Sequence, residues 1–167
     1  SVELTKAYLA RIDAFDHGKA VDVNAIRAFT DDAMAQAKAA DERIAHHDAR
    51  GLMDGIPVIL KDNVGTRDAP TTAGSIALAN NVPRQEATLV TKLRDAGAVI
   101  LAKTNLSEFA NWVDLSMPNG YSSLGGQVHN PYNGGDPSGS SSGSGAGEAL
   151  GYAAAAIGTE TSGSILS

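Results

Sequence analysis

The chain has 167 residues, 43% of them hydrophobic and 19% charged, with a net charge of −6 and no cysteine. This length predicts about one domain, so residues 1–167 are expected to form a single unit. The acidic balance argues against nonspecific nucleic-acid binding, which needs a basic face. The absence of cysteine excludes disulfides, cysteine nucleophiles and zinc–thiolate sites. The apolar runs are far shorter than the roughly 20 residues of a membrane span, no secretory signal is visible, and a cytoplasmic location is expected.

The first third of the chain predicts two helices. Apolar side chains recur at helical spacing over residues 1–15, and Ser1 stands where an N-cap is expected. Residues 23–26 predict a short extended piece. Thr30 is then expected to cap an alanine-rich helix that runs to about residue 47.

Two short apolar runs in the middle of the chain predict buried strands. The first covers residues 56–60, and Pro57 near its start indicates a first or an edge position. The second covers residues 98–102 and follows a predicted helix over 87–95 that Gly97 closes from the C′ position. Because helices alternate with short apolar strands, the sequence favours an α/β fold with a mixed, mostly parallel sheet flanked by helices.

The second half begins with weak signals and then becomes unusual in composition. Asn105 and Glu108 stand three residues apart, like a helix-capping pair, and residues 112–135 are rich in loop formers. Residues 138–147 are nearly all serine and glycine, which is typical of a flexible linker. However, the run leads directly into residues 148–157, which resemble a buried helix and strand. We therefore favour a tightly turned backbone that presents N–H groups and hydroxyls.

Candidate chemistry lies at a serine-rich turn and at one lysine. The turn over residues 158–165 follows an apolar segment and could hold a serine hydroxyl beside several backbone N–H groups, as acyl transfer requires. Lys61, at the end of the first apolar run, is either a surface lysine or a buried one with a depressed pKa that acts as a general base.

Histidine is a weaker candidate for the base than lysine in this chain. His17, His46 and His47 lie in polar segments and are expected at the surface, and His129 lacks a recognisable aspartate partner. The turn around Ser164 has no G-x-S-x-G pattern, and the chain has no phosphate-binding G-x-x-x-x-G-K-[ST] loop.

Three segments in order resemble the amidase signature family. Residues 55–62 resemble its lysine-bearing strand, residues 138–144 its Gly/Ser signature, and residues 158–165 its nucleophile turn. Residues 98–109 and 130–132 are also similar to segments between these landmarks. The similarity covers nearly the whole chain and is closest to the bacterial peptide-amidase-like branch.

The resemblance implies a Ser-Ser-Lys catalytic triad. Ser164 would be the nucleophile and Lys61 the base. Ser140, held by a cis peptide bond, would be the bridging serine that passes the proton between them. A serine hydroxyl is a weak nucleophile at neutral pH and needs a base within reach.

The resemblance also implies a set of supporting groups. The oxyanion hole would be formed by the backbone N–H groups of Thr161, Ser162 and Gly163, while Ser141 would support the hydrogen-bond network and Glu160 would order the nucleophile turn. It implies no metal and no organic cofactor.

The implied reaction is hydrolysis of linear carboxylic amides, including peptide C-terminal amides, to acid and ammonia or amine through an acyl-serine. The substrate would be a small-molecule or peptide amide. Neither nucleic acid nor membrane is expected as a partner. The resemblance is compatible with a homo-oligomer. Ser142 and Ser162 depart from the pattern, since many members carry glycine there. The family's enzymes are longer, so the chain resembles their N-terminal portion.

Three other functions stay open. The first is the glutaminase (A) subunit of a tRNA-dependent amidotransferase, which would need a partner subunit. The second is an inactive amidase fragment. The third is a non-catalytic module that uses the Gly/Ser loop as an anion cradle.

Overall fold

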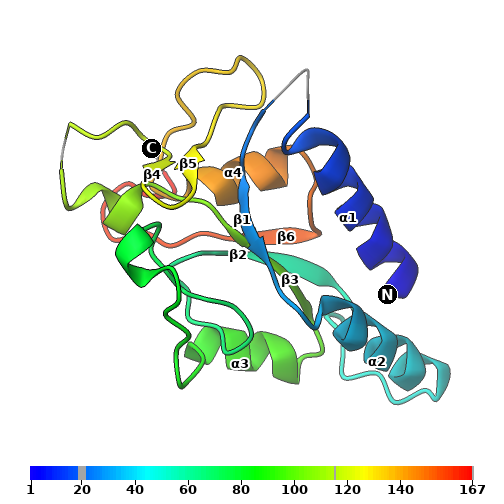
Figure 1. The fold of residues 1–167 in the computed structure, drawn as a ribbon. Helices are drawn as coiled ribbons and strands as arrows, with labels where there is room; N and C mark the ends of the chain where they lie inside the picture. The colour runs from blue at the N-terminus through cyan, green and yellow to red at the C-terminus, as the bar shows by residue number, and fades with distance from the viewer. Residues whose placement is uncertain (19–21, 115, 167) are drawn as a thin grey trace.

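The computed structural model describes residues 1–18, 22–114 and 116–166 (Figure 1). The main elements are α1 (Val2–Phe15), β1 (Ile26–Phe29), α2 (Ala33–Ala45), β2 (Pro57–Lys61), α3 (Thr88–Asp95), β3 (Val99–Thr104), α4 (Ser142–Ala149) and β6 (Ala155–Ile157). The minor elements are β4 (Tyr121–Ser122), β5 (Gly126–Gln127) and the 3₁₀ turns η1 (Ile76–Leu78) and η2 (Glu108–Asn111). None of the helices in the described part of the chain has the length and hydropathy of a membrane span.

A four-stranded sheet in the order β1-β3-β2-β6 forms the centre of the structure. Strand β2 runs parallel to both β3 and β6, and β1 pairs antiparallel with β3. Figure 1 shows α4 and α3 on opposite sides of this sheet. Each face has its own apolar core: α1, α2 and α4 pack on one face, and α3 packs on the other. The predicted α/β class with a mixed, mostly parallel sheet is thus confirmed.

The central position of β2 and β3 in the sheet explains why their sequences are continuously apolar. Every residue of β2 and β3 is buried, because each strand has a paired neighbour on both sides and helices over both faces. Pro57 is the first residue of β2, which is one of the two positions predicted for it. The edge position is wrong, since β2 lies between β3 and β6.

Most of the Ser/Gly run belongs to a buried helix, and the run is not a linker. Helix α4 begins at Ser142, inside the run, and five of its eight residues are buried. A Cβ on Gly143 would lie 2.5 Å from the carbonyl oxygen of Ala25 and 2.7 Å from the backbone nitrogen of Asn105. A Cβ on Gly147 would lie 2.8 Å from Cδ1 of Ile59. The glycines therefore let the helix backbone approach the sheet more closely than any larger residue could.

The boundaries of the first three α-helices follow the prediction with one correction. Helix α1 begins directly after Ser1, and Gly97 has a φ of +86° just beyond α3, in the predicted C′ position. Thr30 does not cap α2, whose N-cap is Asp32. Thr30 instead donates a hydrogen bond to the carbonyl of Ile100, so its hydroxyl binds the sheet.

Two local predictions around the strands are wrong. The extended piece expected over residues 23–26 is shifted, because β1 begins at Ile26. No capped α-helix follows Asn105, since its Oδ1 accepts hydrogen bonds from the Leu106 N–H and the Ser122 hydroxyl. The chain forms only the turn η2, in which Phe109 and Ala110 have positive φ.

Candidate active site

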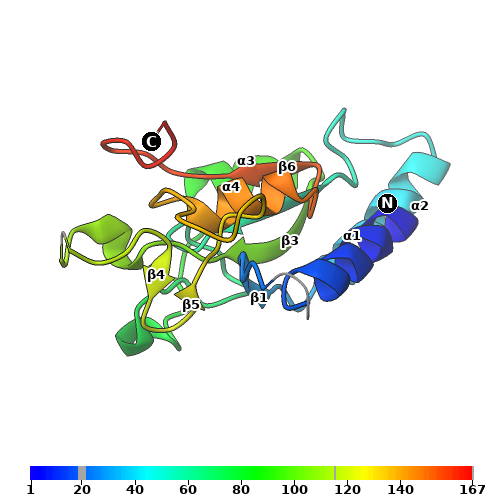
Figure 2. The ribbon, with the colours of Figure 1, turned by 90° about the horizontal axis from the view of Figure 1, so that it is seen from above.

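The site forms where three segments meet at one edge of the sheet. Lys61 is the last residue of β2, and Ser164 lies in the turn that follows β6, the strand parallel to β2. Figures 1 and 2 both place the chain after β6 beside the N-terminal end of α4, which the Ser140–Ser141 pair precedes. Parallel strands end at the same edge of a sheet, which is where α/β proteins place their functional loops.

Two short contacts connect the lysine to the serine of the turn. Lys61 Nζ donates a hydrogen bond to Ser140 Oγ at 2.7 Å, and Ser140 Oγ donates one to Ser164 Oγ at 2.9 Å. The Gly139–Ser140 peptide bond is cis, which is the geometry that the resemblance implies. The three side chains named from the sequence as a triad thus form one continuous chain of hydrogen bonds.

Lys61 lies in an uncharged environment. Its side chain is fully buried, and Nζ also donates to Ser141 Oγ at 2.9 Å and to the Thr159 carbonyl at 3.2 Å. Among the described residues, none forms an ion pair with Lys61. Burial therefore lowers the pKa of the Lys61 ammonium to about 8. A substantial fraction of this amine is neutral, and so able to accept a proton, close to physiological pH.

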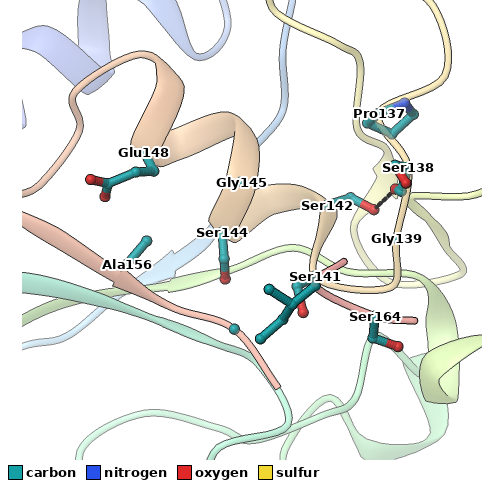
Figure 3. Close-up of a pocket in the computed structure, with 12 residues that line it drawn as sticks. Pro137, Ser138, Gly139, Ser141, Ser142, Ser144, Gly145, Glu148, Ala156 and Ser164 are labelled. Carbon is teal, nitrogen blue, oxygen red and sulfur yellow. Dashed lines mark hydrogen bonds between the residues drawn. The ribbon is translucent and has the colours of Figure 1, made fainter. Parts of the chain in front are cut away.

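Ser141 joins the lysine to the turn that carries Ser164. Its Oγ donates to the carbonyl of Thr159 at 3.1 Å and accepts the Thr159 N–H at 3.2 Å. Its backbone N–H donates to the carbonyl of Ser164 at 3.2 Å. Figure 3 shows Ser141 and Ser164 close together beneath the start of α4. These contacts hold the two serine-bearing segments against each other.

Glu160 holds the turn itself. Its carboxylate accepts the backbone N–H groups of Ile165 at 2.7 Å and Leu166 at 2.9 Å, the two residues that follow Ser164. These hydrogen bonds hold the pKa of the Glu160 carboxyl below its ordinary value. The carboxylate therefore stays ionised and fixes the chain around the half-buried Ser164.

The three residues named for the oxyanion hole lie in the same turn. Thr161 and Ser162 line a cavity of about 260 Å³ together with Lys61 and Ser164, and Gly163 has a φ of +86°. The structure thus places these residues next to the serine hydroxyl. Their role in binding an oxyanion stays a prediction.

A second buried charged cluster was missed from the sequence. Lys103, at the end of the second apolar run, is fully buried, and its Nζ lies 3.2 Å from Asp62 Oδ1. Arg27 forms an ion pair with the same carboxylate through Nε, at 2.5 Å. The signal was present, since an apolar run ending in lysine occurs at both Lys61 and Lys103.

The histidines take no part in this geometry. His17, His46 and His47 are exposed, as predicted, and His129 is half-buried with Nδ1 3.3 Å from the carbonyl of Gly134. Within residues 1–18, 22–114 and 116–166, no histidine contacts the serines or the lysine of the site, and no group of acidic or histidine side chains is arranged to hold a metal ion.

Comparison with known proteins gives a consistent result along the chain. The family model described as Amidase matches residues 3–167. A putative amidase of Arthroderma benhamiae is 42% identical over 168 residues, and the A subunit of the glutamyl-tRNA(Gln) amidotransferase of Geobacter sulfurreducens is 48% identical over 169 residues. The native peptide amidase from Stenotrophomonas maltophilia superposes with a TM-score of 0.94 at 45% identity, over 98% of this chain and 33% of that chain.

The matched relatives are much longer than this chain. Each match covers 99% of the chain but only 28% of the Arthroderma protein and 32% of the Geobacter protein. The chain therefore spans about a third of the length of the curated relatives that it matches.

Proposed function

The chain belongs to the amidase family, and from that premise we propose that it hydrolyses a carboxylic amide through an acyl-serine intermediate on Ser164. The observation that carries the proposal is the chain of contacts from Lys61 Nζ through Ser140 Oγ to Ser164 Oγ, at 2.7 and 2.9 Å. A base within hydrogen-bond reach is what a serine needs to act as a nucleophile. The base is the amine of Lys61, whose neutral form is favoured by its buried and uncharged surroundings.

The first step is attack on the amide. The neutral amine of Lys61 accepts the proton of the Ser140 hydroxyl while Ser140 accepts the proton of Ser164. Ser164 Oγ forms a bond to the carbonyl carbon, and the π electrons move to the carbonyl oxygen. The N–H groups of Thr161, Ser162 and Gly163 are the proposed donors to this oxyanion.

The second step is loss of the amine. The electron pair on the oxyanion re-forms the carbonyl as the C–N bond breaks. Ser140 gives its proton to the departing nitrogen and regains one from the Lys61 ammonium. Water then adds to the acyl-Ser164 ester through the same relay, and the carboxylic acid leaves with Ser164 restored. Ser140 thus carries the proton in both directions, which requires contact with both neighbours.

Peptide C-terminal amides are the substrate that we propose first. Support comes from the likeness to peptide amidase, which covers 98% of this chain at 45% identity. The second candidate is the glutaminase activity of an amidotransferase A subunit, which the 48% identity to the Geobacter protein favours. Ammonia release from glutamine only in the presence of a partner subunit would favour the second candidate, and release from a peptide amide without a partner would favour the first.

Covalent labelling tests whether the site is catalytic. A fluorophosphonate is expected to react with the chain at Ser164, as mapped by mass spectrometry, because only an activated serine attacks phosphorus rapidly. Ser164→Ala should abolish the adduct, whereas Ser116→Ala, the same change at an exposed serine, should not affect it. A folded chain without an adduct would contradict the proposal and favour an inactive fragment or an anion-binding module.

A further inference from the structure

The relay of the proposed mechanism depends on the position of one side chain. Ser140 Oγ lies 2.7 Å from Lys61 Nζ and 2.9 Å from Ser164 Oγ, and a proton can pass only while both contacts hold. Hydrogen bonds of hydroxyl groups span only about 2.5–3.0 Å, so a small displacement of Ser140 breaks one of the two contacts. Groups that fix the segment around Ser140 therefore affect the reaction without touching the substrate.

Ser142 holds this segment from its C-terminal side. Its Oγ donates a hydrogen bond to the carbonyl of Ser138 at 2.5 Å, and Figure 3 shows this bond as a dashed line across the loop. The bond joins the residue two positions before Ser140 to the residue two positions after it. Ser142 is also the first residue of α4 and is buried, so a packed helix anchors this end of the bond.

The Ser142 hydroxyl also packs against the loop that it binds. A Cβ on Gly139 would lie 2.9 Å from Ser142 Oγ and 2.7 Å from Ser107 Oγ, so Gly139 is enclosed between two hydroxyls. Ser107 Oγ accepts the Gly120 N–H at 2.8 Å, and the Ser107 N–H donates to the carbonyl of Ser140 at 3.2 Å. The segment that carries the bridging serine is therefore held from two sides.

Ser138, the residue that Ser142 binds, has a strained backbone. Its φ of +60° is left-handed, which costs about 1–2 kcal/mol for a residue other than glycine. Such a conformation persists only where the surrounding structure imposes it. Two side chains act on it here, since Asp136 Oδ1 accepts the Ser138 N–H at 2.7 Å and Ser142 Oγ donates to the Ser138 carbonyl. Loss of either bond lets Ser138 relax, and the chain that leads to Ser140 moves with it.

We propose that Ser142 is a positioning residue for acyl transfer, which acts by keeping Ser140 Oγ between the lysine and the nucleophile. Asp136 is its counterpart on the other side of Ser138. The inference rests on the proposed function, since it concerns the relay of that reaction. In the described part of the chain, the Ser142 hydroxyl bonds to neither the lysine nor the nucleophile. It therefore determines how often the bridging hydroxyl contacts both neighbours at once.

The test is the rate of fluorophosphonate labelling at Ser164 as a function of pH. In Ser142→Ala we expect the plateau of this rate to fall about 10- to 100-fold, because a small misplacement of the reacting groups has an effect of this size. The midpoint should stay at the wild-type value of about 8, because Lys61 keeps its burial and its hydrogen-bond partners. A defect that reached the surroundings of the lysine would move the midpoint instead.

Asp136 provides a second variant that leaves α4 intact. Asp136→Ala removes the bond to the Ser138 N–H and should lower the same plateau. Asp136→Asn retains an acceptor oxygen at this position and should recover most of the wild-type rate. If Ser142→Ala does not fold, Asp136→Ala carries the test, and a wild-type plateau in this variant would overturn the inference.

Ser144→Ala is the matched control for the loss of a buried hydroxyl in α4. Ser144 Oγ contacts Thr104 Oγ1 at 2.7 Å and the carbonyl of Ile157 at 2.9 Å, and not the loop before the helix. Its removal should lower the free energy of unfolding and leave the plateau unchanged. A wild-type plateau in a folded Ser142→Ala, a moved midpoint in this variant, or an equal loss of rate in Ser144→Ala would overturn this inference alone. A wild-type chain that does not label would overturn both proposals.

Discussion

Lys61 and Lys103 are two buried lysines that the sequence presents in the same way. Each ends an apolar run, each lies near the end of a central strand, and neither side chain is exposed to solvent. The register pairs Leu60 with Lys103 and Lys61 with Thr104, so the two side chains point to opposite faces of the sheet. On one face the amine meets hydroxyls, and on the other it meets a carboxylate.

The partners decide what each lysine can do. Lys103 Nζ lies 3.2 Å from Asp62 Oδ1 and donates to the Val64 carbonyl at 2.8 Å. Burial lowers the pKa of Lys103, but attraction to Asp62 opposes the shift and favours the ammonium form. Lys61 has no such anion among the described residues, and its pKa falls to about 8. Burial alone therefore does not make a base, because a buried cation that keeps its counter-ion stays a structural group.

Replacement of each lysine by arginine should separate the two roles most strongly. Arginine stays protonated in proteins, so Lys61→Arg cannot accept a proton from Ser140. We expect Lys61→Arg and Lys61→Ala to lower the rate of fluorophosphonate labelling at Ser164 by about 100- to 10,000-fold. Lys103→Arg keeps a cation beside Asp62 and should change the rate by no more than a few fold. Similar losses at both positions would contradict the distinction.

Removal of the Asp62 carboxylate should destabilise the face of the sheet on which Lys103 lies. Asp62→Asn leaves Arg27 and Lys103 without their buried counter-charge, and we expect the free energy of unfolding to fall by about 3–5 kcal/mol. The measurement is urea unfolding at pH 7. The double variant Asp62→Asn/Lys103→Met removes one of the two unbalanced cations and should recover about 1 kcal/mol or more. A double variant that is less stable than Asp62→Asn would show that packing, and not charge balance, decides the loss.

The sequence identified the elements of the site better than it distinguished between these lysines. The alternation of apolar strands and helices was enough for the fold class, because buried parallel strands read as continuous apolar runs. Lys61 was named as a candidate from its place at the end of an apolar run, and only the resemblance to a family assigned it as the base; the same local pattern at Lys103 was not considered. The deciding contacts come from residues distant in sequence: Ser140 for Lys61, and Arg27 for the carboxylate beside Lys103.

Helix α4 shows a second limit of the sequence pattern. Serine and glycine are poor helix formers, so residues 138–147 are typical of a linker by composition. The helix forms because Gly143 and Gly147 allow its backbone to pack against the sheet, where larger side chains would collide with Asn105 and Ile59. Tertiary packing therefore outweighs local propensity at this helix, and no local rule could have revealed its start at Ser142.

Replacement of each lysine by methionine should change stability in opposite directions. Below about pH 8 the folded state holds a buried Lys61 ammonium without a counter-ion, whereas the unfolded state holds it in water. Lys61→Met removes that unfavourable charge, and we expect a gain of about 1–2 kcal/mol at pH 7, measured by urea unfolding. The gain should shrink between pH 8 and the ordinary lysine pKa, because wild-type stability rises while the unfolded state still binds a proton that the folded state has lost. Lys103→Met should be destabilising at pH 7, because Asp62 loses one of its cations.

The smallest effect concerns Ser141, whose hydroxyl is one of the few groups that solvate the Lys61 ammonium. Because Ser141 Oγ accepts from Lys61 Nζ at 2.9 Å, its removal disfavours the charged amine and should lower the pKa of Lys61 further. In Ser141→Ala, the midpoint of the labelling rate against pH should therefore move below the wild-type value of about 8, by up to about one pH unit.

Ser144 provides the matched control for this shift. It is buried in α4, which Ser141 precedes, but its hydroxyl contacts Thr104 Oγ1 at 2.7 Å and the carbonyl of Ile157 at 2.9 Å, and not the lysine. Ser144→Ala should lower stability without moving the midpoint. If Ser141→Ala lowers the labelling rate equally at every pH and leaves the midpoint in place, the Ser141 hydroxyl only holds the two serine-bearing segments together. A midpoint that moves in Ser141→Ala alone would show that the environment of Lys61, down to a single hydroxyl, sets the pH at which the relay can accept a proton.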